Sequence, residues 1–127
     1  MSQESCRWGI LGAAGIAHKN WQSIRRAGNA ELVAVASRDV AKAQDFIDRC
    51  GAQVSHPVTP EAIGSYEEML AREDIDAIYL PLPTGLRAEW AVKVAEAGKH
   101  LLCEKPCGTD MAELDSILDA CRQADVQ

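Results

Sequence analysis

The sequence contains no run of basic residues. It has 13 lysines and arginines against 19 aspartates and glutamates, a formal net charge of −6, and its densest basic spot is the pair Arg25 and Arg26. A nucleic-acid-binding surface needs clustered positive charge, because the release of counterions from the phosphates drives binding. The composition therefore excludes a nucleic acid as the partner.

Long apolar runs are also absent. None approaches the roughly 20 residues that a membrane-spanning helix requires, and the polar start MSQESCRW lacks the apolar region of a secretion signal. No low-complexity tract or linker divides the chain, and 127 residues that are 47% hydrophobic can bury one core. We expect residues 1–127 to form one domain of a soluble, cytoplasmic protein with no membrane partner.

The five cysteines include no C-x-x-C pair. Their odd number argues against a disulfide framework and suits a reducing compartment. His100, Cys103 and Cys107 could be imagined as zinc ligands, but they lack the paired spacing of zinc sites. Cys103 lies in an apolar run, where a cysteine usually acts as a small buried hydrophobe. We predict no metal site.

What the chain does contain is a regular alternation of apolar and amphipathic segments. Apolar runs predict strands at residues 6–13, 30–37, near 62–63, 76–83 and 99–105, and residues 124–127 resemble the start of a sixth. Helical spacing predicts helices at residues 16–27, 40–50, 65–72, 84–97 and from 110 onward. Strand and helix repeat about every 25 residues, which indicates right-handed crossovers. The expected fold is α/β, a doubly wound parallel sheet that stops before its sixth strand.

Local signals place the helix ends. Gly28, Gly51 and Gly98 are expected to follow three of the helices, and Thr84 is expected to cap another. Two further helices are expected to open with the pairs Ser65 and Glu68, and Asp110 and Glu113. Inward-facing side chains are expected at Leu86, Trp90 and Val94 of one helix, and at Met111, Leu114, Ile117, Leu118 and Cys121 of the last.

A glycine-containing turn follows the first expected strand and opens the first expected helix. It has the form G-x-A-x-x-A, a variant of the dinucleotide-binding fingerprint, and comprises Gly12, Ala13, Ala14, Gly15, Ile16 and Ala17. Gly12 would make the tight turn, Ala14 would let a pyrophosphate approach, and the helix N-terminus would present free N–H groups to it. Small residues at such a turn can also be purely structural.

The tip of the second expected strand carries Ser37 and Arg38, the latter 26 residues after Gly12. An acidic residue there would hold the ribose hydroxyl of NAD, whereas an arginine suits the 2′-phosphate of NADP. The sequence therefore favours NADP over NAD. Two alternatives remain open, that Arg38 is an ordinary solvated side chain and that Asp39 caps the next helix.

Five segments occur in an order typical of one family: WGILGAAGIA, ELVAVASRD, GSYEEML, DIDAIYLPLPTGLRAEW and EAGKHLLCEKP. Together they resemble the N-terminal domain of the glucose–fructose oxidoreductase/inositol dehydrogenase/MocA family. The forms W-G-I-L-G, A-S-R-D and Y-L-P-L-P are similar to its NADP-dependent branch, which includes D-xylose 1-dehydrogenases and dihydrodiol dehydrogenases. The resemblance implies an oxidoreductase that moves hydride between NADP and a sugar- or polyol-type hydroxyl or carbonyl.

The resemblance also implies roles for individual residues. Lys105 would reach the nicotinamide and the reacting group as the catalytic residue, with Glu104 lining the same crevice and Pro106 fixing the turn. Further cofactor contacts would come from the end of the preceding strand, at Leu80, Pro81, Leu82 and Pro83. The alternative for Lys105 is a surface ion pair with Glu104.

Two departures from the family pattern stand out. Thr84 and Arg87 occupy the positions where the family usually has asparagine and histidine, so the contacts there are expected to differ from the family's. Family members also continue into a second α/β domain that supplies the substrate pocket, a catalytic histidine and the oligomer interface. We therefore expect the chain to be the cofactor-binding portion of a longer architecture and inactive alone. The alternatives are a non-catalytic NADP(H)-binding or regulatory module, and a fragment without stable function.

Overall fold

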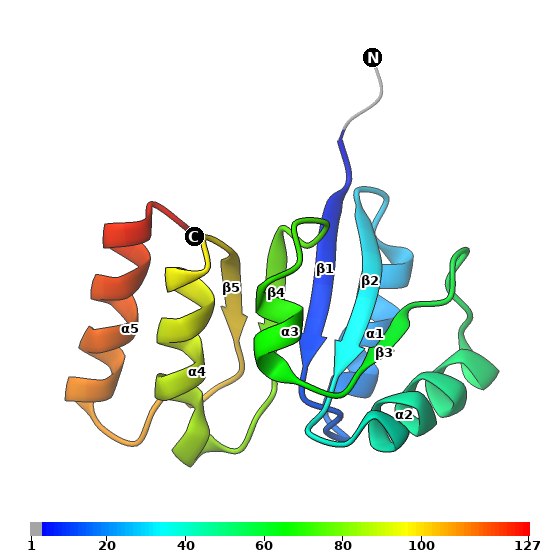
Figure 1. Ribbon diagram of the computed structural model, residues 1–127, viewed down its shortest axis with the longest axis horizontal. Coiled ribbons are helices and arrows are strands. Elements are labelled where there is room, and N and C mark those ends of the chain that lie inside the picture. The colour runs from blue at the N-terminus through cyan, green and yellow to red at the C-terminus, as the bar shows by residue number, and fades with distance from the viewer. Residues whose placement is uncertain (1–3) are drawn as a thin grey trace.

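The computed structural model describes residues 4–127, which form a five-stranded parallel sheet in the order β3-β2-β1-β4-β5. The sheet confirms the predicted doubly wound architecture, because the strand order runs outward in both directions from β1 (Figure 1). The strand bounds are β1 Cys6–Leu11, β2 Ala30–Ala36, β3 Glu61–Ile63, β4 Ala77–Leu80 and β5 His100–Cys103.

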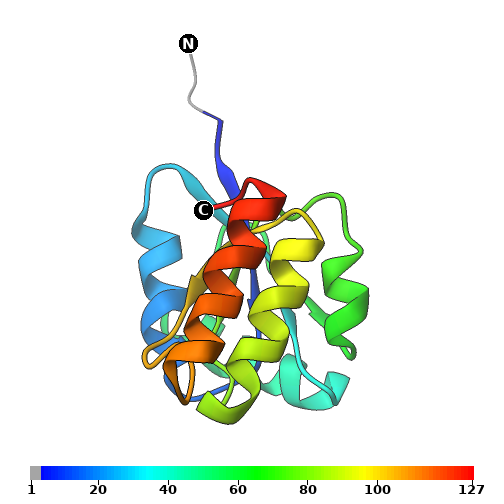
Figure 2. The same cartoon turned by 90° about the vertical axis from the view of Figure 1, so that its left-hand side faces the viewer.

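Helices follow each strand and cover both faces of the sheet. Their bounds are α1 Ala17–Arg26, α2 Val40–Gln53, α3 Tyr66–Leu70, α4 Thr84–Glu96 and α5 Met111–Ala124. One face carries α1 and α2, which bury Trp21, Phe46 and Ile47 against Ile10 and Tyr79. The helices α3, α4 and α5 lie on the other face, and Figure 2 shows α4 and α5 side by side.

Successive side chains along each strand point alternately into these two cores, as in any strand covered on both faces. In β1, Ile10 joins the α1 and α2 side while Leu11 joins the α3 and α4 side, and both are completely buried. Tyr79 and Leu80 divide in the same way along β4. This explains why the strand sequences read as continuous apolar runs rather than as alternating ones.

Three predicted helix caps are confirmed. The side chain of Asp39 accepts a hydrogen bond from Ala41 N, that of Ser65 from Glu68 N, and that of Asp110 from Glu113 N. Gly98 follows α4 in the left-handed conformation with φ +77°, as a glycine after a helix often does.

Two predicted helix boundaries were wrong. Gly51 does not stop α2, which continues to Gln53. Trp21 Nε1 on α1 donates to Val54 O at 2.7 Å and holds this end of α2 against α1. Thr84 does not cap α4 but is its first helical residue, with Pro83 in the cap position and no side-chain cap bond. The Thr84 hydroxyl instead accepts a hydrogen bond from Arg87.

Three side chains predicted to face inward are exposed instead. They are Leu86, Met111 and Leu118, and the last two lie on α5. That helix packs mainly on α4, through a face that contains the buried Ile117. The helical spacing of the apolar residues is as predicted. No part of the described chain, however, covers the side of α5 that carries Met111 and Leu118.

The final residues do not form the predicted strand, yet they lie where one would begin. Gln127 O accepts a hydrogen bond from Leu101 N at 2.9 Å, which places it alongside the outer edge of β5. The backbone N–H of Gln127 also donates to His100 Nδ1 at 3.0 Å. His100 therefore has a structural role at the edge of the sheet.

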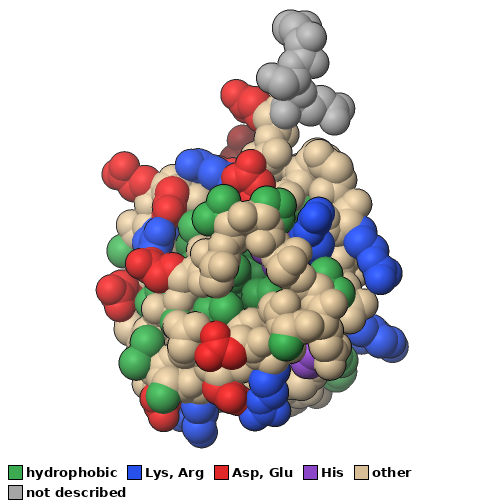
Figure 3. All heavy atoms as spheres, turned by 90° about the vertical axis from the view of Figure 1, so that its right-hand side faces the viewer, with side chains coloured by type: hydrophobic (Ala, Val, Ile, Leu, Met, Phe, Trp, Pro, Cys, Tyr) green, Lys and Arg blue, Asp and Glu red, His purple; other side chains and the backbone are tan. Residues whose placement is uncertain are grey.

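The face beside β3 and α2 has a hollow lined by hydrophobic side chains, with acidic side chains along one side and basic ones along the other (Figure 3). A cavity of about 500 Å³ lies between the start of β2 and the loop that contains His56 and Val58. The His56 ring lies edge-on to Trp21, and burial lowers the pKa of this histidine. The cavity is at the opposite end of the sheet from the loops described next.

None of the helices within residues 4–127 has the length and apolar character that a membrane span requires.

Candidate functional site

The carboxyl ends of all five parallel strands meet at one edge of the sheet. The strand order reverses there between β1 and β4, so the loops that follow these two strands turn to opposite faces. Sheets of this kind bind ligands in the crevice at such a point. Most of the predicted site residues lie on four loops at this edge: residues 12–16, 37–39, 81–83 and 104–110. The fold thus brings together segments that are far apart in the sequence.

Gly12 makes the turn at the end of β1, as predicted. Its φ is +119°, a conformation that residues with a side chain rarely adopt. A Cβ atom at this position would lie 2.8 Å from Leu82 Cδ2, so the loop after β4 also requires a glycine here. Its own N–H donates to Ala36 O at 2.9 Å and keeps the turn attached to β2.

The turn after Gly12 leaves backbone donors free at the start of α1. This helix has no side-chain cap bond, unlike α2, α3 and α5, whose caps are aspartate or serine. Its first turn also contains no acidic residue. Four N–H groups donate to no group within residues 4–127, namely those of Ala13, Ala14, Gly15 and Ile16. Such a set of donors at a helix N-terminus is an anion-binding site.

The surroundings of the turn leave room for a ligand. A Cβ atom on Gly15 would meet nothing within 4 Å, so the backbone is accessible on that side. Ala17 is completely buried, which lets α1 lie close to the sheet as the fingerprint requires. The turn therefore has space beside its free N–H groups, and the predicted binding of a pyrophosphate there stays a prediction.

The three residues at the tip of β2 differ in exposure and in hydrogen bonding. Ser37 is buried, and its hydroxyl accepts a long hydrogen bond of 3.4 Å from Asp39 N. Arg38 is exposed and makes no ion pair or side-chain hydrogen bond within the described chain. Asp39 caps α2, so the alternative proposed for it is correct. The arginine is left available to a ligand.

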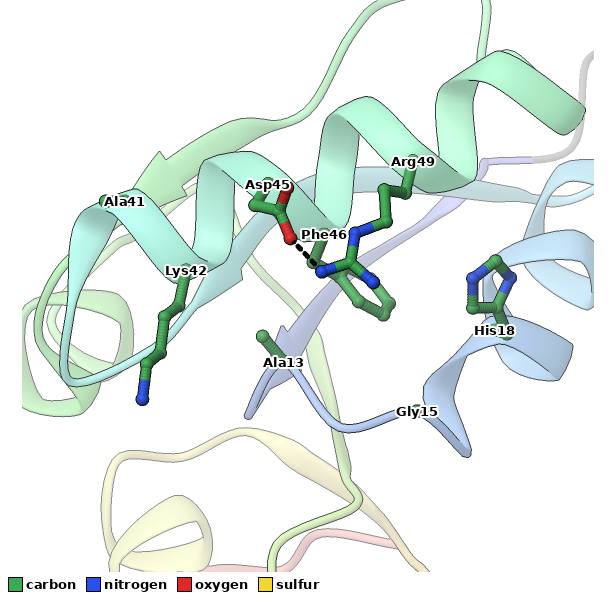
Figure 4. A pocket seen from close by; sticks show the side chains of 8 residues that line it. All are labelled: Ala13, Gly15, His18, Ala41, Lys42, Asp45, Phe46 and Arg49. Carbon is green, nitrogen blue, oxygen red and sulfur yellow. Dashed lines mark ion pairs between the residues drawn. The ribbon is translucent and has the colours of Figure 1, made fainter.

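A cavity of about 460 Å³ lies between this turn and α2 (Figure 4). Ala13 and Gly15 line one wall, and the other carries Lys42 and Arg49 on one helix face. Arg49 is paired with Asp45 at 2.5 Å, whereas the Lys42 side chain points away from that pair and has no ion-pair partner in the described chain. The sequence analysis missed Lys42. Its position four residues after Arg38, in the first turn of α2, was the available signal.

The loop after β5 carries the predicted catalytic residue. Lys105 is exposed and Glu104 is half-buried, and the Glu104 N–H still bonds to Leu80 O at 3.1 Å as the last link of the sheet. Among the described residues Glu104 and Lys105 form no ion pair, so the alternative of a surface pair between them was wrong. The Lys105–Pro106 peptide bond is cis.

The predicted cofactor contacts at the end of β4 are unequally accessible. Leu80 is completely buried in the core, Pro81 and Leu82 are also buried, and Pro83 is exposed. The first three therefore offer little surface to a ligand. Beside them Tyr79 has a completely buried hydroxyl for which the structure shows no hydrogen-bond partner. Burial raises the pKa of Tyr79, and the nearby Asn20 lowers it in part.

A metal centre is not built by this arrangement. Among residues 4–127 no group of three histidine, cysteine or acidic side chains is placed to hold a metal ion. All five cysteines are free thiols. Burial raises the pKa of Cys103 to about 12, so its sulfur stays protonated at neutral pH.

A parallel sheet with a reversed strand order, a glycine turn and free N–H groups at the first helix defines a nucleotide-binding Rossmann domain. The chain belongs to the oxidoreductase family with an NAD-binding Rossmann fold, GFO_IDH_MocA, whose family model matches residues 6–127. The predicted family is therefore confirmed.

The relatives include an enzyme of the branch that the sequence resembles. The D-xylose 1-dehydrogenase (NADP(+)) 2 of Haloferax volcanii is 42% identical over 119 residues, which cover 94% of this chain and 34% of that protein. The chain spans about a third of the length of the curated relatives it matches.

Solved structures show the same fold with cofactor bound. KijD10, a 3-ketoreductase from Actinomadura kijaniata in complex with NADP, matches with a TM-score of 0.86 and 33% identity over 97% of this chain and 37% of that one. The WlbA dehydrogenase from Bordetella pertussis, in complex with NADH and UDP-GlcNAcA, matches with a TM-score of 0.81 and 28% identity over 98% and 36%.

Proposed function

We propose that this chain is the coenzyme-binding part of an NADP-dependent oxidoreductase that acts on a hydroxyl or carbonyl group of a sugar-like substrate. The observation that carries this proposal is the set of free N–H groups at the start of α1, at the same sheet edge as Arg38 and Lys105. The xylose dehydrogenase and the 3-ketoreductase among the relatives support the substrate class. The substrate itself would be chosen by residues outside this chain.

In this proposal, each loop binds a different part of the dinucleotide. The N–H groups from Ala13 to Ile16 would bind the pyrophosphate, with Gly12 holding the turn that presents them. Arg38 would bind the 2′-phosphate with its planar set of donors, assisted by the Ser37 hydroxyl. Lys42 would add a second positive charge across the neighbouring cavity. NADP is therefore preferred to NAD.

Bound NADP would supply the nicotinamide carbon that accepts or donates hydride. Lys105 would then hold and transfer the proton of the reacting hydroxyl, because its amine is exposed at the crevice and is not occupied by Glu104. Residues 81–83 would border the nicotinamide end, where the loops after β4 and β5 meet. The free thiols are compatible with a cytoplasmic location. The same proposal includes a homo-oligomer whose interface would be supplied by the family's second domain.

Lys105→Ala tests the proposal against a purely cofactor-binding module. In a chimera that joins this chain to the remaining two thirds of the Haloferax volcanii enzyme, we expect turnover to fall at least 100-fold, typical of a lost general acid–base. NADPH affinity, measured by nicotinamide fluorescence, should change less than about threefold, because the amine contributes little to binding. The matched control is Lys19→Ala on the exposed side of α1. Equal turnover of the two variants would favour the non-catalytic module.

A further inference from the structure

Arg87 is a buried arginine with no acidic partner. Its side chain lies in the first turn of α4 and the residue is only 7% exposed. No carboxylate lies within 4 Å of its guanidinium in the described chain. A buried charge without a counterion is costly unless hydrogen bonds satisfy it, so the bonds that Arg87 makes are the reason for its position.

Those bonds join two loops. Arg87 Nε donates to Leu82 O at 2.5 Å, and Nη1 donates to Pro106 O at 2.7 Å. A longer bond of 3.3 Å runs from Nη1 to the Thr84 hydroxyl. The guanidinium therefore bridges the loop after β4 and the loop after β5. Its contact in the second loop is Pro106, the residue next to Lys105.

Few other contacts join these loops. The sheet pairing of β4 with β5 ends at the bond from Glu104 N to Leu80 O. Beyond that bond, the hydrogen bonds that connect the two loops among residues 4–127 all pass through Arg87. Cys107 also packs against the core cluster that contains Leu82. The guanidinium is therefore the polar link that sets the spacing between Leu82 and Lys105 beyond the sheet.

We propose that Arg87 is a positioning residue that holds Lys105 at a fixed distance from the loop bordering the nicotinamide end. This inference deepens the proposed function and rests on it. Leu82 also packs against the place where a Cβ of Gly12 would be, so the same loop contacts the phosphate turn. One buried cation thereby couples the catalytic loop to the phosphate-binding loop.

The geometry requires arginine rather than another cation. The planar guanidinium presents Nε and Nη donors in a fixed fork, which can bond two carbonyls in different directions at once. Lysine donates from a single nitrogen and would have to reach both carbonyls from one point, whereas Arg87 uses Nε for one and Nη1 for the other. The replacement of the family's usual histidine by Arg87 thus has a structural explanation.

The first experiment measures the clamp without any ligand. Amide hydrogen exchange of Glu104, whose N–H bonds to Leu80 O beside the clamp, should be at least about tenfold faster in Arg87→Ala than in the native chain, because a bond from a charged donor to the adjoining loop is lost. Arg122→Ala, an exposed arginine on α5, is the matched control and should leave this exchange unchanged. Unchanged exchange in Arg87→Ala would overturn the clamp.

The second experiment separates the nicotinamide end from the adenosine end. NADPH affinity should fall about tenfold in Arg87→Ala, because the loop at residues 81–83 that borders the nicotinamide end loses its bond to the guanidinium. Affinity for 2′,5′-ADP, which lacks the nicotinamide, should stay within about twofold. Arg87→Lys should show most of the NADPH defect, and millimolar guanidinium should restore affinity to Arg87→Ala. An equal loss for both ligands, or no rescue, would contradict the positioning role. If the native chain binds neither ligand, the proposed function fails, while hydrogen exchange still decides on the clamp.

Discussion

Gly12 and Gly15 belong to the same turn but are needed for different reasons. Gly12 has a positive φ, and an added Cβ would collide with Leu82, so it is required by the fold itself. Gly15 has open space around it and an ordinary backbone conformation, so the fold does not require a glycine there. In the proposed function, the pyrophosphate would approach the backbone through the space beside Gly15.

Gly12→Ala and Gly15→Ala should therefore separate stability from binding. Gly12→Ala should lower the free energy of unfolding by about 1–3 kcal/mol, because it strains the backbone and displaces Leu82. Gly15→Ala should leave it equal or raise it by up to about 1 kcal/mol, yet should weaken NADPH binding. Urea unfolding and fluorescence titration measure the two quantities. A stable Gly12→Ala variant would refute the argument from geometry.

Arg38 and Lys42 provide a second prediction at this scale. Arg38→Glu should reverse the coenzyme preference, so that NADH binds more tightly than NADPH, because a carboxylate repels the 2′-phosphate and accepts from the ribose hydroxyl. Lys42→Ala should weaken NADPH binding by a smaller factor and leave NADH unchanged. Equal affinities for both coenzymes in the native chain would remove the role assigned to Arg38.

At the scale of the elements, an ion pair joins the start of β1 to the start of β4. The carboxylate of Asp76 accepts from the backbone N–H of Arg7 at 2.9 Å, from Nε at 3.0 Å and from Nη2 at 2.8 Å. These bonds lower the pKa of Asp76 to about 2, and the hydrogen bond from the Arg7 side chain is the main cause. Both side chains remain partly exposed, so solvent screens the interaction.

The pH dependence of stability follows from that pKa. A carboxyl whose folded pKa lies below its unfolded value of about 3.9 stabilises the fold above that pH and loses its contribution as the pH falls toward 2. Asp76→Asn should therefore be less stable than the native chain at pH 7 and nearly as stable at pH 2. Thermal unfolding across this range measures the difference, with Asp115→Asn as the exposed control. A gap that persists at pH 2 would contradict the assignment.

At the scale of the whole molecule, the loops with the candidate site lie at one edge of the sheet, and exposed hydrophobic residues lie on the β5 side. The phosphate turn, the tip of β2 and the loops after β4 and β5 all lie at the carboxyl edge of the sheet. On the β5 side, Leu102, Met111 and Leu118 are exposed hydrophobic residues, and Gln127 lies along the edge of β5.

Coenzyme binding should therefore stabilise the molecule as a unit. At a concentration of NADPH 100 times its dissociation constant, the free energy of unfolding should rise by about 2.7 kcal/mol. The same concentration of NADH should give a smaller increase, because it lacks the 2′-phosphate. Calorimetry or fluorescence-monitored melting would show the difference as a shift in Tm. Equal shifts would argue that the tip of β2 does not contact the coenzyme.

Much of this protein was predictable from its sequence because the relevant interactions are local. Strands covered on both faces must be apolar throughout, helix caps such as Asp39 and Ser65 bond within a few residues, and the turn at Gly12 needs a glycine wherever it occurs. Those signals were sufficient for the parallel sheet and for the loops that carry Arg38 and Lys105.

Other features depend on contacts between distant parts of the chain, and only the tertiary structure decided them. The extra turn of α2 past Gly51 exists because Trp21 bonds to Val54 from another helix. Arg87 bonds to a carbonyl 19 residues away, which no helical or strand period encodes. The apolar residues of α5 repeat with the correct period, but their burial depends on whether another surface covers them. Local sequence specifies backbone conformation, whereas the partners of a side chain depend on how the elements pack.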